Sequence, residues 1–157
     1  GTMNNLAMGK RGQNGWDYYE TLAGGMGASH DCNGRSARHS HMTNTLNTPV
    51  EVLELNYPLR IERYAIRRGS GGKGQFRGGD GVIRRYRFLE GAEVSLLTER
   101  RRNPPWGLEG GQAGQCGYNI LDGQELSGKV QFQAAADQVL SVETPGGGGY
   151  GIPALKS

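Results

Sequence analysis

The chain has no long hydrophobic run and very little cysteine. None of its apolar stretches approaches the roughly 20 residues that a membrane-spanning helix requires, and nothing at its start resembles a signal peptide. Its two cysteines, Cys32 and Cys116, make neither a disulfide framework nor a zinc-binding pattern. We therefore expect a cytoplasmic protein with two free thiols and no membrane partner.

What the chain has in excess is glycine. There are 28 glycines in 157 residues, roughly two and a half times the average usage of about 7%. They follow no collagen-like period and gather between short apolar runs, most densely at Gly146–Gly149. Glycine is needed where φ is positive or where another group must approach the backbone closely. The clusters therefore predict tight corners, a ligand cradle, or both.

The positive charge is concentrated in the middle of the chain. The net charge is +3, but residues 60–102 contain twelve Lys or Arg and five Asp or Glu, a balance of +7. The residues before and after this segment sum to −1 and −3. Such a segment is typical of solvated strand faces with local ion pairs. The alternative is that it faces an anion, an acidic partner or nucleic acid.

The length fits one domain, which we expect to cover residues 1–157. Residues 1–48 are polar and loop-rich, so we expect them to cover the core or a partner. Within them only Trp16–Ala23 is dense enough in apolar groups to pack, and it predicts a short helix ended by glycines. Pro49 then predicts a helical turn, because proline favours the first helical position.

The remainder, residues 49–157, predicts strands separated by Gly-rich turns. In one of them Ala92, Val94 and Leu96 share a face, as in a half-buried strand. An irregular alternation predicts a bulge near Glu62, and Asp122-Gly123 is a hairpin signal. The fold class is therefore mainly β (α+β at most), a Gly-rich sandwich or barrel-like core of at least five short strands. The predicted strands are Leu59–Arg68, Val82–Leu89, Ala92–Thr98, Tyr118–Leu121, Val130–Ala134 and Leu140–Val142.

One glycine cluster satisfies a nucleotide-binding pattern only formally. Gly69–Gly74 reads G-x-G-x-x-G after a predicted strand, but the residues after it are too rich in glycine to open the helix that a pyrophosphate site needs. Two interpretations remain: a structural connection between strands, or a backbone nest for an anionic group of a substrate. In the second, Gly71, Gly72 and Arg77 would lie near the anion.

His39 and His41 are the only two strong metal ligands close together in the sequence. On an extended segment, residues i and i+2 point to the same side, so both imidazoles can reach one ion. His30 and Asp31 are candidates to complete such a site. The alternative is that the histidines form hydrogen bonds that fix a loop.

Arg100–Gly107 joins a basic run to a rigid turn that carries a tryptophan. Its two prolines fix φ and so constrain the backbone that leads to Trp106. An arginine beside this ring can stack on it or bind an anion; alternatively, Trp106 covers the end of the sandwich. A single Arg-Gly-Gly at Arg77 is weak support for RNA binding, and we expect no nucleic-acid partner.

Several strings, taken in order, resemble the C-terminal part of the hydantoinase B/5-oxoprolinase (HyuB-like) family. Together they run over nearly the whole chain and are specific. They are Gly1–Asn5, Tyr18–Ala28, His39–Asn44, Asn47–Glu51, Ser70–Gly79, Pro104–Gly107 and Thr144–Gly151.

The resemblance implies part of an ATP-dependent hydrolase that opens cyclic amides, such as 5-oxoproline or hydantoins, through a phosphorylated intermediate. ATP would be bound by a HyuA-like partner and not by this chain, and a divalent metal (Mn or Zn) would be held by His39 and His41. The candidate catalytic residues are His39, His41 and Asn44, and the candidate substrate-binding residues are Gly71, Gly72 and Arg77. Family members are several times longer, so we expect this chain to be inactive without the N-terminal HyuB portion.

Two other functions fit the same resemblance. One is a non-catalytic assembly module of a HyuA/HyuB complex, and the other is part of a related ATP-dependent ketone carboxylase. The sequence does not decide among a lactam, a hydantoin and a ketone as the small-molecule substrate.

Overall fold

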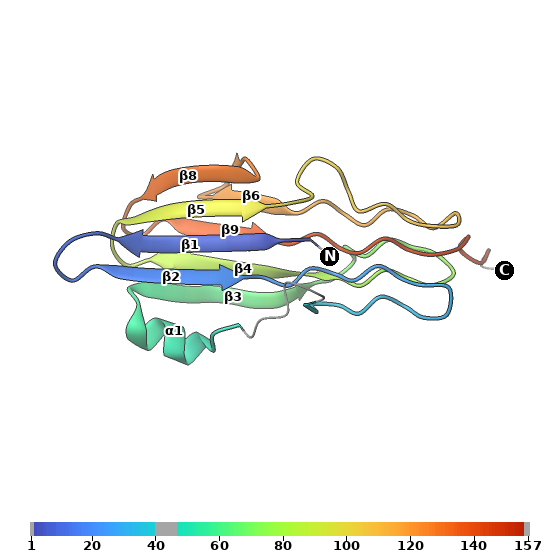
Figure 1. The fold of residues 1–157 in the computed structure, drawn as a ribbon, viewed down its shortest axis with the longest axis horizontal. Coiled ribbons are helices and arrows are strands. Elements are labelled where there is room, and N and C mark those ends of the chain that lie inside the picture. Colours follow the sequence, from blue (N-terminus) through green and yellow to red (C-terminus); the bar gives the residue numbers. More distant parts are fainter. Residues whose placement is uncertain (1, 40–46, 156–157) are drawn as a thin grey trace.

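The computed structural model describes residues 2–39 and 47–155, which form nine strands and one helix (Figure 1). Two antiparallel sheets have the strand orders β2-β1-β5-β8 and β3-β4-β9-β6-β7. The elements are β1 (Asn4–Lys10), β2 (Trp16–Thr21), α1 (Val50–Asn56), β3 (Leu59–Arg67), β4 (Gly81–Phe88), β5 (Ala92–Thr98), β6 (Tyr118–Leu121), β7 (Gln124–Leu126), β8 (Lys129–Ala134) and β9 (Val139–Glu143).

The two sheets pack face to face and enclose one hydrophobic core, which confirms the predicted mainly β sandwich. Val94 and Leu96 of β5 are buried on the inner face of the first sheet. Tyr86 and Phe88 of β4 and Leu140 of β9 face them from the second sheet. The period of two along each strand therefore decides which side chains enter the core.

Local predictions in the second half of the chain are confirmed. The register of β3 on β4 shifts between Ile61 and Arg63, where a bulge was expected. Asp122 and Gly123 have φ values of 46° and 83° and join β6 to β7 as a tight hairpin. Positive φ at both positions is what a type I′ turn requires.

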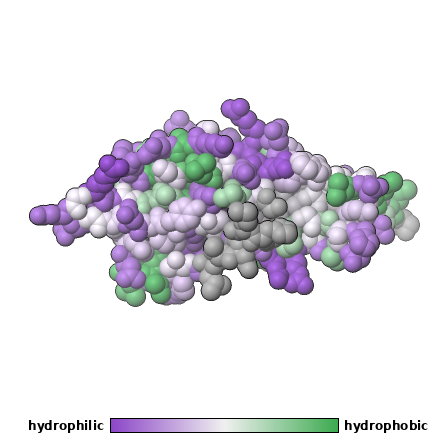
Figure 2. Space-filling view, in the orientation of Figure 1, coloured by the Kyte–Doolittle hydropathy of each residue, from purple (hydrophilic) through white to green (hydrophobic). Residues whose placement is uncertain are grey.

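The predicted helical turn is helix α1, but Pro49 is its N-cap and the first helical residue is Val50. The helix buries Leu53 against the sandwich and leaves Val52 and Leu55 exposed, where Figure 2 shows a hydrophobic patch. Over the residues it describes, the structure contains no helix with the length and hydrophobicity of a membrane span. Cys32 is exposed, Cys116 is half-buried, and neither forms a disulfide.

The short helix predicted at Trp16–Ala23 is wrong, because most of this segment is strand β2. It pairs with β1 from Asn5 opposite Thr21 to Lys10 opposite Trp16. Tyr18 and Glu20 alternate inward along it, which the clustered aromatic residues conceal in the sequence. The polar first part of the chain therefore supplies half of one sheet and does not merely cover the core.

Beyond one end of the sandwich, extended segments run side by side along the long axis of the molecule (Figure 1). We call residues 24–38, 70–80, 104–116 and 144–151 the glycine bundle. Its segments are joined by backbone hydrogen bonds, but these do not form regular sheet ladders. The central segment is Gly146–Gly149, which bonds to each of the other three parts of the bundle.

Hydrogen bonds along the central segment repeat every three residues. The carbonyls of residues 145 and 148 accept from residues 25 and 28, which are also three apart. The amides of residues 146 and 149 donate to residues 115 and 112, and those of residues 147 and 150 donate to residues 79 and 76. A period of three is the geometry of the left-handed polyproline II helix, and a β-strand would have a period of two.

Glycine is required in this segment by space and not by backbone conformation. None of Gly146–Gly149 has a positive φ, so the cluster does not turn a corner. A Cβ on Gly147 would lie 2.0 Å from the Met26 carbonyl oxygen, and one on Gly148 would lie 1.9 Å from that of Trp106. Close approach of backbone to backbone therefore explains the four consecutive glycines, as it explains the axial glycines of collagen.

Two arginines hold the strand ends that lie next to the bundle, and one of them, Arg67, contacts the bundle itself. Arg101 donates to the side-chain oxygens of Asn4 at 2.8 Å and Asn119 at 3.0 Å, and burial lowers its pKa to about 10. Arg67 donates to the carbonyls of Cys116 at 2.6 Å and Thr144 at 3.2 Å. These bonds fix how the chain leaves the strands.

We predict that Gly147→Ala destabilises the protein by about 1–3 kcal/mol or prevents folding, because the surrounding backbone cannot yield as a side chain can. The midpoint of urea unfolding measures the change in the free energy of unfolding. Gly91→Ala is the control, since its Cβ would meet nothing closer than 3.5 Å. Equal midpoints for the two variants would contradict the close-packed bundle.

Candidate functional site

A buried ion pair joins the two sheets. Arg84 of β4 and Glu20 of β2 have side chains that are 0% and 3% exposed, and Arg84 Nη1 lies 3.3 Å from Glu20 Oε1. The other carboxylate oxygen of Glu20 accepts a hydrogen bond from the Tyr86 hydroxyl. Arg84 also donates to the Thr48 carbonyl at 3.3 Å, and its guanidinium lies 4.6 Å from the centre of the Tyr64 ring.

Burial changes how tightly these groups hold their protons. Desolvation raises the pKa of Glu20 above its ordinary value of 4.5, although Arg84 and Tyr86 act in the opposite direction. Burial and the nearby Glu20 charge raise the pKa of Tyr18 to about 12 and that of Tyr86 well above 10. The tyrosines therefore remain protonated, and Glu20 takes up a proton at a higher pH than an exposed glutamate does.

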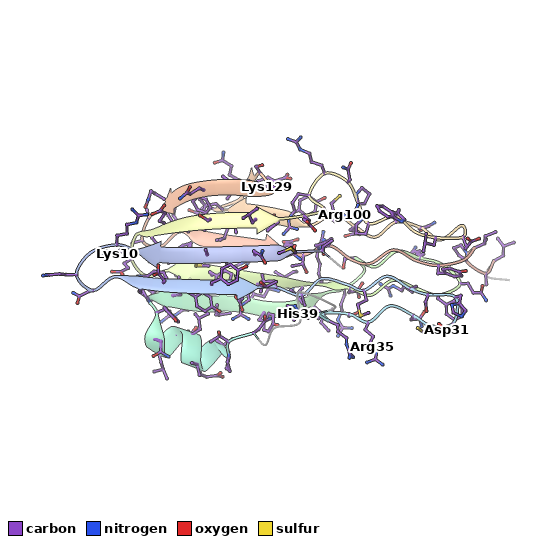
Figure 3. All side chains as sticks on the ribbon, in the orientation of Figure 1. Lys10, Asp31, Arg35, His39, Arg100 and Lys129 are labelled. Carbon is purple, nitrogen blue, oxygen red and sulfur yellow. The ribbon has the colours of Figure 1, made fainter. Side chains whose placement is uncertain are left out.

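His39 lies beside this cluster and interacts with the charge of Glu20. Figure 3 shows it near the end of the sandwich from which the glycine bundle extends. Both ring nitrogens are shielded from solvent, and within the described residues neither has a hydrogen-bond partner. A buried polar group without a partner is costly, so these nitrogens are suited to binding another group or exchanging a proton.

The other two residues predicted with His39 cannot be placed. His41 and Asn44 lie outside the described residues. Their role in catalysis therefore stays a prediction.

The described residues do not by themselves make a metal site. In the ranges 2–39 and 47–155, no three His, Cys, Asp or Glu side chains cluster in a way that could hold an ion. Asp31 lies far out along the glycine bundle, well away from His39 (Figure 3), and its carboxylate is 3.9 Å from His30 Nδ1. The carboxylate beside His39 is that of Glu20, which already binds Arg84. A metal held by His39 and His41 stays a prediction.

The predicted substrate-binding residues lie within the glycine bundle. Gly72 donates its N–H to the Gly147 carbonyl at 2.8 Å, and Gly71 donates to Asp80 Oδ1 at 2.8 Å. Arg77 Nη2 lies 3.2 Å from the same Asp80 oxygen. The structure thus brings Gly71 and Arg77 together at Asp80, and both glycine amides bind protein acceptors. Their contact with a substrate anion stays a prediction.

A groove of about 370 Å³ runs along the glycine bundle. Its floor is Gly146–Gly149, one wall is residues 24–28, and the other contains residues 105, 106 and 108. Arg38 and Arg100 also line it, and no carboxylate among the described residues does. The Arg100 guanidinium lies 4.5 Å from the centre of the Trp106 ring, which is one of the two arrangements expected for this turn. The groove therefore suits a ligand with oxygen acceptors.

Sequence reasoning missed Glu20, Arg84 and Tyr86 as members of a site. A signal for the last two was present, because Arg84, Tyr86 and Phe88 alternate with residues of the other face in a predicted strand. An arginine on the apolar face of a strand predicts a buried partner. The partner, Glu20, was missed because Trp16–Ala23 was predicted to be a helix and not a strand.

Comparison with known proteins gives a consistent result. The family model described as hydantoinase B/oxoprolinase matches residues 1–153. A 5-oxoprolinase from Dictyostelium discoideum is 43% identical over 156 residues, which cover 96% of this chain and 12% of that protein. A putative D-/L-hydantoinase subunit from Pseudomonas sp. is 32% identical over 152 residues, covering 92% of this chain and 26% of that protein.

Two solved structures share the fold. An ATP-dependent caprolactamase from Pseudomonas jessenii superposes with a TM-score of 0.78 and 25% identity, over 98% of this chain and 30% of that one. An acetone carboxylase has a TM-score of 0.69 and 19% identity, over 94% of this chain and 25% of that one. This chain therefore spans less than a third of each of these four proteins.

Replacing Arg84 by methionine should destabilise the protein by about 3–5 kcal/mol at neutral pH, because Glu20 loses its cation. Arg84 lowers the pKa of Glu20, so in the variant that pKa rises further above 4.5. A carboxyl whose pKa is raised by folding contributes stability below its unfolded pKa and loses that contribution as the pH rises through its folded pKa. The deficit should therefore shrink as the pH falls toward 4.5.

Urea unfolding of Arg84→Met at a series of pH values measures this effect. The matched control is the double variant Glu20→Gln/Arg84→Met, which has no buried charge at these two positions and should recover stability with little pH dependence. A deficit that is the same at every pH, or a double variant no more stable than the single one, would contradict the assignment.

Proposed function

Because this chain belongs to the hydantoinase B/oxoprolinase family, we propose that it is the C-terminal portion of a HyuB-type subunit in an ATP-dependent hydrolase of cyclic amides. The substrate class is a lactam such as 5-oxoproline, or a hydantoin. The family match over nearly the whole chain is the observation that carries the proposal. The described residues add an imidazole whose ring nitrogens are shielded from solvent, beside a buried carboxylate, and such an imidazole is a suitable acid–base group.

The carbonyl carbon of a cyclic amide is a weak electrophile and has to be activated before water attacks it. Resonance makes an amide carbonyl resistant to attack by water, and transfer of a phosphoryl group to its oxygen creates a leaving group. ATP held by a HyuA-like partner would supply that phosphoryl group. Water then adds to the activated carbon and the ring C–N bond breaks; the nitrogen leaves as an amine that takes up a proton, and an acyl phosphate remains. A second water attacks this acyl phosphate and releases inorganic phosphate and the carboxylate.

In this scheme His39 accepts the proton of the attacking water. Its ring nitrogens are shielded from solvent and have no partner among the described residues, so one is available as a base. The carboxylate of Glu20 lies beside the ring and interacts with it electrostatically. Arg84 and Tyr86 keep the Glu20 carboxylate in place. In the same scheme His41 and Asn44 contact the substrate, and the cluster of Gly71, Gly72 and Arg77 lies near its anionic group.

A non-catalytic role in assembly is the second candidate. The open groove along the bundle favours it, because a HyuB-type subunit contains much more chain than these residues. In that case His39 and Glu20 would only stabilise the sandwich. Activity therefore has to be measured in a protein that contains the rest of the subunit.

The test is a chimera in which this chain replaces the matched part of the Dictyostelium discoideum 5-oxoprolinase. We expect ATP-dependent release of glutamate from 5-oxoproline by the chimera and none by the isolated chain. His39→Ala in the chimera should lower kcat about 100-fold, as expected for loss of a general base. His30→Ala is the control, since that side chain is exposed and distant from the cluster.

Equal activity of the His39 and His30 variants would show that His39 is not catalytic. A folded chimera without activity would favour the assembly role or a different substrate. Metal analysis of the same proteins tests the Mn or Zn prediction: absence of metal, with no effect of changing both His39 and His41, would overturn it.

A further inference from the structure

The central segment of the glycine bundle has neighbours on five sides and an open sixth side. Five extended stretches surround it: residues 24–28, 76–80, 70–74, 111–115 and 105–108. Each stretch in this order is also bonded to the next. Gly79 donates to Met26, Gly78 to Gly72, Gln112 to Lys73 and Gly114 to Pro105. Among the described residues no such bond closes the ring between residues 105–108 and residues 24–28, and the groove lies there.

The direction of each hydrogen bond identifies the sixth side. The carbonyls of residues 147, 148 and 149 accept in turn from residues 72, 28 and 108, so each step along the segment turns by a third of a circle. The amides of residues 147 and 149 donate to residues 79 and 112. Because each residue is rotated by a third of a circle, the amide of Gly148 points into the gap between residues 24–28 and residues 105–108. No described residue accepts a hydrogen bond from it.

The residues three before and three after Gly148, which face the same direction, need no further hydrogen-bond acceptor. One step of the period before Gly148 is Pro145, which has no N–H to satisfy. One step after it, the amide of Gly151 donates to the Leu108 carbonyl. Gly148 is therefore the one amide of the central run, among the described residues, that faces the groove without an acceptor.

We infer that this groove holds a sixth extended segment, contributed by the part of a HyuB-type subunit outside the matched region. Its chemistry follows from the site. It adopts the polyproline II conformation, one of its carbonyls accepts from Gly148, and glycine faces the floor at every third position, because the other segments approach to backbone contact. The groove's described lining contains Arg38 and Arg100 and no carboxylate, which favours a segment that presents carbonyl oxygens.

This inference rests on the proposed family role, because that role supplies the additional chain. The matched residues make up 26% of the hydantoinase subunit and 30% of the caprolactamase chain. A segment joined to the same polypeptide also meets the groove at a high effective concentration, so that few contacts suffice to hold it.

Gly27→Leu provides a steric test. Gly27 lines the groove, has no positive φ, and its Cβ would meet only the Gly148 carbonyl oxygen, at 3.9 Å. The larger side chain should leave the thermal midpoint of the isolated chain unchanged. In the 5-oxoprolinase chimera it should compete with the sixth segment and lower the midpoint. Gly91→Leu, at an exposed glycine of the sandwich, is the matched control and should have little effect in either protein.

Hydrogen exchange gives a second, independent readout. In the isolated chain the amide of Gly148 should exchange much faster than that of Gly147, which is bonded to Gly79. In the chimera it should exchange roughly 100-fold more slowly than in the isolated chain, because it gains an acceptor. Mass spectrometry with single-residue fragmentation resolves the two amides.

A Gly148 amide that exchanges equally fast in both proteins, or a Gly27→Leu chimera as stable as its parent, would overturn the inference. Inorganic phosphate that protects Gly148 in the isolated chain would also overturn it, since the groove would then be an anion site. Hydrolysis of 5-oxoproline is measured separately. An active chimera with an unprotected Gly148 would refute the sixth segment alone, and an inactive one with a protected Gly148 would refute the catalytic proposal alone.

Discussion

Backbone-to-backbone contact around Gly146–Gly149 is the constraint on which the rest of the arrangement depends. Residues 24–38 come after β2, residues 70–80 join β3 to β4, and residues 104–116 join β5 to β6. All three pack on the segment that comes after β9. Connections that would otherwise be independent loops thus become one structure, and its geometry places both His39 and the groove.

The bundle and the sandwich are stabilised by different kinds of interaction. The sandwich buries large apolar side chains such as Phe88 and Leu96 and gains from the hydrophobic effect. The bundle buries almost no side chains along its axis and depends on hydrogen bonds, each of which contributes only about 0.5–1.5 kcal/mol. The buried ion pair of Glu20 and Arg84 belongs to neither class. Such a pair seldom adds stability over apolar packing, and in this chain it lies beside His39.

Periodicity was enough to predict much of the sandwich but not its first two strands. Residues 92–98 alternate cleanly, and the Asp122-Gly123 turn has a specific backbone requirement, so both could be predicted. Strand β2 could not, because Tyr18 and Tyr19 together hide the alternation and only pairing with β1 selects the extended form. The glycine clusters indicated an unusual backbone, but the sequence alone cannot show whether a glycine is needed for a positive φ or for the close approach of another backbone segment.

The site was harder to predict for the same reason. Its described members come from strands of opposite sheets and from a loop, and no local pattern links them. His39 was singled out because it forms a local pair with His41 in the sequence, whereas Glu20 was recognised only when β2 was placed opposite β4. The inward alternation of Arg84 was the one local sign that a buried acid had to exist.

The three-residue repeat of the central segment also limits how this part of the chain can change in length. Loss of one residue from the run at 146–149 would rotate every later donor and acceptor by a third of a turn and aim each at the wrong neighbour. Loss or gain of three residues would restore the directions and change only the length of the axis. Insertions and deletions in this segment should therefore occur in multiples of three residues, because only these keep every donor and acceptor directed at its neighbour.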